Sequence, residues 1–98
     1  MVRAPDSGTP GVAQAWLDAL GEKLRAEGYR VVLNAPADRS PSLDVMNPSV
    51  PMMRDRVTAG LRADGAWWYW FSFGEPLSDA IDLAEAVRRI GKVLGCPE

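Results

Sequence analysis

The first hydrophobic stretch of the chain repeats with the period of an α-helix. One narrow arc of the helical wheel carries Ala13, Leu17, Leu20 and Leu24, with Trp16 at its edge. Thr9 and Pro10 resemble an N-cap and a first helical residue, and Gly28 is typical of the residue that ends a helix. The pattern therefore predicts a helix over 12–27, preceded by a flexible tail at residues 1–8.

The next part of the chain changes to β-branched and alternating positions. Four predicted strands cover 29–34, 42–46, 52–62 and 66–73. Prolines and polar residues separate the first three strands, and Asp64-Gly65 is a strong signal for a two-residue hairpin turn. Short links between successive strands predict an antiparallel meander.

A second amphipathic helix closes the sequence. Ser78 or Asp79 is the predicted N-cap, and Gly95 and Pro97 end the helix. Its apolar stripe consists of Leu83, Val87, Ile90 and Leu94. No linker or repeat interrupts the pattern, so residues 9–98 form one predicted α+β domain of order α-β-β-β-β-α. We expect a four-stranded sheet with both helices packed on one face.

Most aromatic residues of the chain lie in the strand that follows the hairpin turn, between Trp67 and Phe73. Alternate residues of a strand point to opposite faces. A two-residue turn pairs Ala63 with Ala66, and this register puts Trp68 and Trp70 on the helix-covered face. The predicted core is therefore Trp16, Leu17, Leu20, Leu24, Val31, Leu43, Val45, Val57, Leu61, Trp68, Trp70, Leu83, Val87 and Ile90.

The second face of the sheet then combines aromatic rings with arginines and methionines. The predicted interaction residues are Trp67, Tyr69, Phe71, Phe73, Arg54, Arg56, Arg62, Met46 and Met52. Aromatic, methionine and arginine enrichment is typical of interface cores. We therefore expect protein binding through this face, most simply as a homodimer of two stacked sheets, or with another cytoplasmic protein.

Three alternatives remain open at this point. One helix on each face would close the core around the aromatic rings. A bulge in the hairpin would exchange the two faces of the aromatic strand. The rings could also stack on an apolar small molecule or on single-stranded bases while Arg54, Arg56 and Arg62 hold phosphate. Nucleic acid is the less expected ligand, because the formal net charge is -2 and no ribonucleoprotein-type motif is present.

The composition restricts the chemistry of this 98-residue chain. There is no histidine, which excludes a Ser-His-Asp triad, a Cys-His pair and a His-ligated metal. Cys96 is the single cysteine and therefore forms neither an internal disulfide nor a thiolate zinc site. The glycines form no phosphate-binding loop. Asp79, Asp82 and Glu85 fit a solvated helix start better than a metal site. We expect no cofactor, no metal and no enzymatic activity.

The sequence also predicts the compartment. No apolar run approaches the ~20 residues that a membrane-spanning helix needs. Residues 1–10 lack the basic start and apolar centre of a signal peptide, and no disulfide framework is present. We therefore expect a cytoplasmic protein without membrane contact.

Several motifs resemble those of a group of small actinobacterial proteins of unknown function, which are encoded near helix-turn-helix regulators. The motifs are Asn47-Pro48-x-x-Pro51, the run from Trp67 to Pro76, and the downstream Asp82, Ala86, Ile90 and Val93-Leu94. The resemblance covers roughly residues 13–95 and implies a cytoplasmic accessory or regulatory role without catalytic residues. This chain departs from the group at Phe73, where tryptophan is usual, and near Thr58, where cysteine is frequent.

Overall fold

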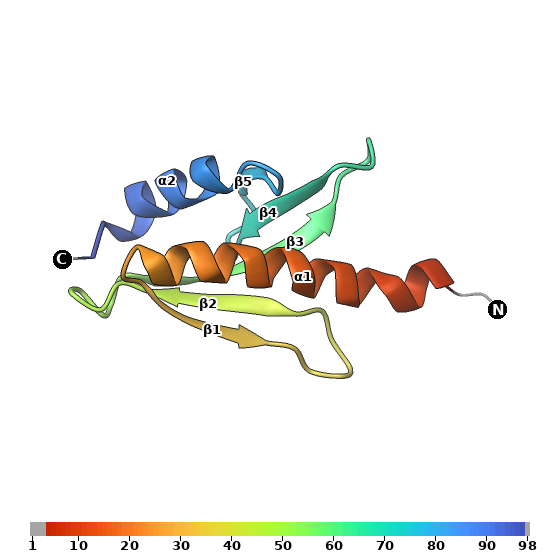
Figure 1. Cartoon of the computed structure of the whole chain (residues 1–98), viewed down its shortest axis with the longest axis horizontal. Helices are drawn as coiled ribbons and strands as arrows, with labels where there is room; N and C mark the ends of the chain where they lie inside the picture. The colour runs from red at the N-terminus through yellow and green to blue at the C-terminus, as the bar shows by residue number, and fades with distance from the viewer. Residues whose placement is uncertain (1–3, 98) are drawn as a thin grey trace.

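Two helices and five antiparallel strands make up the computed structural model, which describes the backbone of residues 4–97 and the side chains of 11–97. The elements are α1 (Ala4–Ala26), β1 (Arg30–Asn34), β2 (Ser42–Met46), β3 (Arg54–Leu61), β4 (Trp67–Phe71), β5 (Pro76–Asp79) and α2 (Leu83–Leu94). The strands are hydrogen-bonded in the order β1-β2-β3-β4-β5 (Figure 1). The predicted α+β class is confirmed.

The predicted four-stranded sheet is wrong, because a fifth strand follows the aromatic one. Gly74-Glu75-Pro76 looked like the end of the sheet but forms a tight turn. Gly74 adopts φ +86°, its N–H donates to the Phe71 carbonyl at 3.0 Å, and the Phe71 N–H donates to the Glu75 carbonyl at 2.9 Å. β5 then pairs with β4, with Asp79 opposite Trp68, across a bulge near Tyr69.

The first helix begins at Ala4, earlier than the predicted N-cap at Thr9. Residues 4–8 are therefore helical where a tail was expected, and residues 1–3 of that predicted tail lie outside the described residues. Proline is tolerated in the first turn of a helix, where its missing N–H would have no intrahelical partner. Pro5 therefore fits this earlier start.

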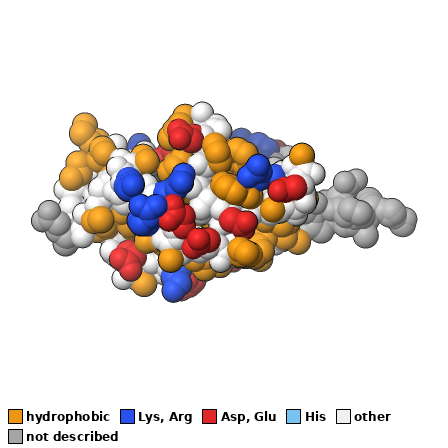
Figure 2. All heavy atoms as spheres, turned by 90° about the horizontal axis from the view of Figure 1, so that it is seen from above, with side chains coloured by type: hydrophobic (Ala, Val, Ile, Leu, Met, Phe, Trp, Pro, Cys, Tyr) orange, Lys and Arg blue, Asp and Glu red, His pale blue; other side chains and the backbone are white. Residues whose placement is uncertain are grey.

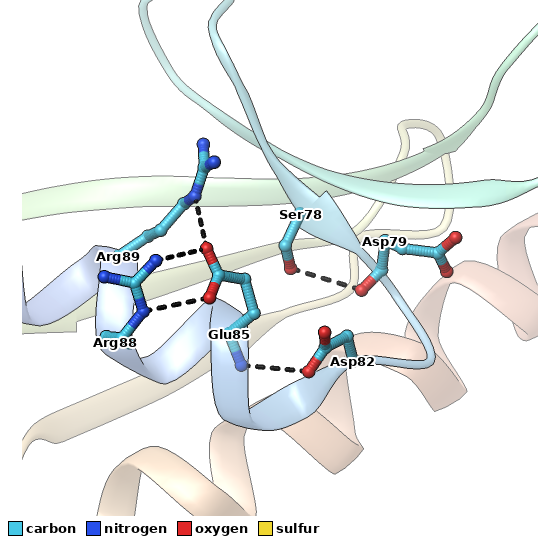
Figure 3. Close-up of polar contacts among 6 residues, drawn as sticks. All are labelled: Ser78, Asp79, Asp82, Glu85, Arg88 and Arg89. Atoms are coloured by element: carbon cyan, nitrogen blue, oxygen red, sulfur yellow. Dashed lines mark hydrogen bonds and ion pairs between the residues drawn. The ribbon is translucent and has the colours of Figure 1, made fainter.

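The N-cap of the second helix lies three or four residues after the two predicted caps, Ser78 and Asp79. This N-cap is Asp82, whose carboxylate accepts a hydrogen bond of 3.1 Å from the Glu85 N–H (Figure 3). Asp79 is instead the last residue of β5, and Ser78 pairs with Tyr69 inside the sheet. The predicted end at Gly95 is confirmed, since Gly95 is the C-cap with φ +79°.

Both helices lie on the same side of the sheet (Figure 1), and their apolar stripes join one buried cluster with the inward-facing strand residues. The fully buried members include Leu17, Leu20, Leu24, Leu43, Val45, Val57, Tyr69, Leu77 and Ile90. Leu83 and Val87 pack against this cluster while remaining half-buried. Leu61, a predicted core residue, is 53% exposed because it lies at the end of β3.

A buried asparagine joins the turn after β2 to the end of α2. The Asn47 amide donates to the Leu94 carbonyl at 3.0 Å, and its side-chain oxygen accepts from the Ser49 N–H at 2.9 Å. The last carbonyls of a helix have no intrahelical partner. Asn47, which begins the Asn-Pro motif, therefore supplies a hydrogen bond that the helix cannot make itself.

Both edges of the sheet carry features that weaken further strand pairing. On β1, the Arg25 guanidinium from α1 donates to the Val31 carbonyl at 3.2 Å. On β5, Pro76 has no N–H to offer a further strand. Because both helices cover one face, the opposite face is the largest part of the sheet that no other element covers.

Candidate binding face of the sheet

The turn between β3 and β4 determines which aromatic residues face the helices. The Arg62 N–H donates to the Ala66 carbonyl at 2.8 Å, and the Gly65 N–H donates to the Arg62 carbonyl at 2.9 Å. The turn therefore has three residues, 63–65, with Gly65 at φ +88°. The predicted two-residue turn is wrong, and the register moves by one residue.

This shift exchanges the two faces of β4, because strand residues alternate with period two. Val57 lies opposite Phe71 and Ala59 opposite Tyr69, and these pairs face the helices. Tyr69 is fully buried, and its hydroxyl donates to the Trp16 carbonyl of α1 at 2.6 Å. Burial raises the pKa of the Tyr69 hydroxyl above its ordinary value. Tyr69 and Phe71 are core residues and do not reach the surface that the sequence assigned to them.

Trp67 and Phe73 also lie apart from that predicted surface. Trp67 is half-buried and packs against the core cluster. Phe73 lies beyond the end of β4 and is 61% exposed, with its ring stacked on Phe71 at a centroid distance of 5.0 Å. It lines a depression of about 260 Å³ together with Arg88 and other residues of α2. The expected group of four aromatic residues on one exposed face is therefore wrong.

The face opposite the helices, which we call the open face, carries the two tryptophans that were expected in the core. Thr58 lies opposite Trp70, and Gly60 lies opposite Trp68. Both tryptophans are half-buried. The Arg62 guanidinium lies over the Trp68 ring at 4.6 Å from its centroid, a cation–π geometry. The structure thus matches the alternative in which a change in the hairpin turn exchanges the two faces of the aromatic strand.

Three arginines from neighbouring strands occupy the other end of the open face. Arg30 lies opposite Met46, which lies opposite Arg54, and Arg56 is two residues further along β3. Met46 is half-buried and Arg54 is exposed, as are Arg30 and Arg56. The structure therefore keeps Met46, Arg54 and Arg56 of the predicted site together. Met52 is separate, 83% exposed in the turn after β2.

A hydrogen-bonded group crosses the centre of the open face. Asp44 accepts from the Arg56 Nε and from the Asn34 amide, both at 2.9 Å. Partial burial by itself would raise the pKa of Asp44, but these two hydrogen bonds and the charges of Arg56 and Arg54 lower it below the usual range. Asp44 therefore remains ionised and fixes the position of Arg56.

Two adjoining depressions lie on either side of this group. One of about 600 Å³ is lined by Arg30, Arg54, Arg56 and Met46 and by the two aspartates Asp44 and Asp55. The other, of about 850 Å³, is lined by Asn34, Thr58 and Arg39. Arg56 lines both, so together they form a shallow trough across β1, β2 and β3. We call this the arginine trough.

Sequence reasoning missed Asp44, Asn34 and Arg30 as members of this face. The strands that contain them were predicted nearly correctly. The alternation of faces within each strand would have placed these residues on the open face. Arg30, Val32 and Asn34 share one side of β1, and Asp44 lies on the matching side of β2.

A second charged group lies on the outer surface of α2, away from the open face. Glu85 accepts hydrogen bonds of 2.9 and 2.7 Å from Arg88 and one of 2.8 Å from Arg89 (Figure 3). Basic and acidic side chains accordingly lie next to one another over this helix (Figure 2). These pairs neutralise part of the helix surface.

Within the described part of the chain, no group of three or more histidine, cysteine, aspartate or glutamate residues is placed to hold a metal ion. Among the same residues, no helix is long and apolar enough to cross a membrane.

No protein-family description, no curated protein and no solved structure matches this chain at a significant level. The resemblance to small actinobacterial proteins therefore stays a prediction, and the function rests on the geometry of the open face.

Proposed function

We propose that the protein is a non-enzymatic binding module that holds an anionic partner on the open face of its sheet. One observation carries this proposal: the uncovered face presents Trp68 and Trp70 together with more arginines than acids. The charged residues of this face and of the arginine trough are Arg30, Arg39, Arg54, Arg56, Arg62, Asp44, Asp55 and Asp79, five arginines against three aspartates. The face is therefore positive, although the chain as a whole has a formal net charge of -2.

The side-chain chemistry supports binding at this face. Tryptophan and arginine are the residues most often found at energetic hot spots of interfaces. Arg30 and Arg54 form no ion pair with any described residue, so their charges are available to a partner. A cation over a tryptophan ring contributes about 0.5–1 kcal/mol at an exposed site and more when a partner excludes water.

The homodimer expected from the sequence is less favoured on this face. Stacking two open faces brings two net-positive surfaces together, which opposes association. An anionic partner in the cytoplasm, the predicted compartment, meets complementary charge instead. An accessory or regulatory role is the biological setting that fits such a module and the actinobacterial resemblance.

Binding to a polyanion tests the proposal. We expect the protein to bind immobilised heparin at low ionic strength, and each of the single variants Arg30→Glu and Arg54→Glu to elute at clearly lower salt. Lys23→Glu on α1, on the helix side of the sheet, is the matched charge reversal and should change elution much less. Circular dichroism confirms that all variants are folded. The proposal fails if the wild-type protein does not bind, or if Lys23→Glu has the larger effect.

A further inference from the structure

We propose that the anionic partner is a single-stranded nucleic acid, whose phosphates lie along the arginine trough and whose bases stack on Trp70 and Trp68. The inference rests on the proposed function and assigns the chemistry of its partner. It follows from the spacing of the cations, the position of the two indole rings and the charge of the face.

The cations are spaced along and across the sheet rather than gathered at one point. Arg54 and Arg56 point from the same side of β3 and are about 7 Å apart along the strand. Arg30 lies two strands away across Met46, at about 10 Å. These spacings belong to the strand positions, so one small anion would be contacted only if the side chains converged on it. A chain of phosphates can contact them without such convergence.

Trp70 lies against bare backbone, which makes it suited to stacking. A Cβ added to Gly60 would be 3.6 Å from the Trp70 Nε1 and 3.9 Å from its Cδ1. The indole therefore extends from β4 toward β3, where glycine leaves room for the ring to lie close to the sheet. A ring in this position presents an aromatic surface to solvent, as the stacking platforms of single-strand binders do.

Trp68, the neighbour of Trp70 on the open face, has a cation over its ring. The Arg62 guanidinium lies 4.6 Å from the centroid of the Trp68 ring, and guanidinium planes themselves stack on bases. Trp68 and Trp70 are two residues apart on the same side of β4. The two indoles and Arg62 therefore form a short row of planar groups beside the arginine trough.

This combination favours nucleic acid over an acidic peptide. A glutamate-rich peptide meets the charge of Arg30, Arg54 and Arg56 but has no planar groups for the indoles. Each base of a single strand has an aromatic face, so stacking is possible without a particular sequence. The absence of a ribonucleoprotein-type motif is compatible with binding of this general kind.

Fluorescence anisotropy of a labelled oligothymidylate, with poly-glutamate of the same charge as competitor, tests the inference. We expect the wild-type protein to bind the oligonucleotide and poly-glutamate to compete weakly. The affinity should fall as salt rises, with a slope of log affinity against log salt near -2, because about three phosphates are neutralised and each contributes about 0.7.

Three variants separate stacking from charge. Trp70→Ala should weaken binding by about 5- to 100-fold, the range expected for the loss of one base–aromatic stack, with an unchanged salt slope. Trp70→Phe should recover part of that loss. Arg54→Ala should weaken binding and reduce the salt slope by about 0.7. Lys23→Ala, which also removes one positive charge but on α1, should leave both quantities close to those of the wild type.

The outcomes distinguish this inference from the function on which it rests. If poly-glutamate competes as well as the oligonucleotide and Trp70→Ala has no effect, the partner is an acidic protein and the nucleic-acid inference is overturned. If the protein binds heparin but not the oligonucleotide, the nucleic-acid inference is also overturned. If neither polyanion binds, the proposed function itself fails.

Discussion

Glu85 illustrates how strongly two side chains can act on one partly exposed carboxylate. Hydrogen bonds from Arg88 and Arg89 lower the pKa of Glu85 to about 2. A carboxylate whose pKa is lower in the folded state stabilises the fold when it is ionised. That contribution is complete above the unfolded-state pKa and is lost as pH falls through the folded-state pKa.

The pH dependence of unfolding should report this carboxylate. We expect the wild-type free energy of unfolding to fall between about pH 4.5 and pH 2, and Glu85→Gln to reduce that slope. Urea denaturation followed by circular dichroism at a series of pH values measures it. Glu22→Gln is the control, because the Glu22 carboxylate is more exposed and lies 3.8 Å from the Arg25 guanidinium. Identical slopes for the wild type and Glu85→Gln would show that the Glu85 pairs do not persist in solution.

At the level of the elements, the turn between β3 and β4 determines which side chains of β4 lie on the open face. Two hydrogen bonds between Arg62 and residues 65–66 close a three-residue turn, and Gly65 supplies the positive φ that this turn requires. The number of residues in this turn determines which β3 residue lies opposite each residue of β4. A two-residue turn would have placed Tyr69 and Phe71 on the open face.

Glycine-to-alanine changes at two exposed positions should have opposite signs. A Cβ at Gly65 or at Gly11 meets no atom within 4 Å, so packing is the same in both cases. Gly65→Ala should lower the free energy of unfolding by about 1–2 kcal/mol, because φ is +88° there. Gly11→Ala lies within α1 and should raise it by about 0.5–1 kcal/mol.

Chemical denaturation of both glycine variants gives the comparison directly. A stabilising effect of Gly65→Ala would mean that the turn does not need a left-handed residue. The register, and with it the identity of the open face, would then have to be revised.

The sequence predicted the elements with long repeating patterns better than those decided by local backbone geometry. Leu17, Leu20 and Leu24 are buried as their helical spacing indicated, and Ile90 is buried on α2. The turn at 63–65 was missed because Asp64-Gly65 is also found in two-residue turns, which differ from three-residue turns by a single loop residue. β5 was missed because four residues that begin with proline carry almost no periodic signal.

The candidate site residues were likewise predicted correctly where repeating patterns placed them and wrongly where a single turn did. Arg54, Arg56 and Met46 lie together on the open face, because the β2–β3 pairing followed from the alternation of their strands. Tyr69 and Phe71 are in the core, because their side depended on one turn residue. Trp68 and Trp70 took their place, so the predicted chemistry of arginine beside aromatic rings is retained by different rings.

At the scale of the whole molecule, charge is distributed unevenly. The open face is positive by two charges, whereas the formal net charge of the chain is -2, so the remaining surface is acidic. An acidic molecule with one basic face attracts polyanions only in one orientation. The same distribution makes the response to salt differ between the two modes of association considered for this face.

Light scattering at low and high salt should distinguish them. We expect a monomer at low ionic strength, because the repulsion between two open faces is weakly screened there, with a Debye length of ~30 Å at 0.01 M against ~10 Å at 0.1 M. A homodimer formed through this face would strengthen as salt screens that repulsion, and Trp70→Ala would weaken it. A dimer at low salt that Trp70→Ala dissociates would contradict the expectation and restore the stacked homodimer.

The blunted edges of the sheet have a consequence for the behaviour of the protein in concentrated solution. An uncovered edge strand can recruit a strand from another molecule and start fibrous aggregates. Here the Arg25 guanidinium occupies an acceptor of β1, and Pro76 removes a donor from β5. Each edge therefore offers a strand from another molecule one hydrogen-bonding group fewer, which weakens the edge-to-edge pairing that would extend the sheet from copy to copy.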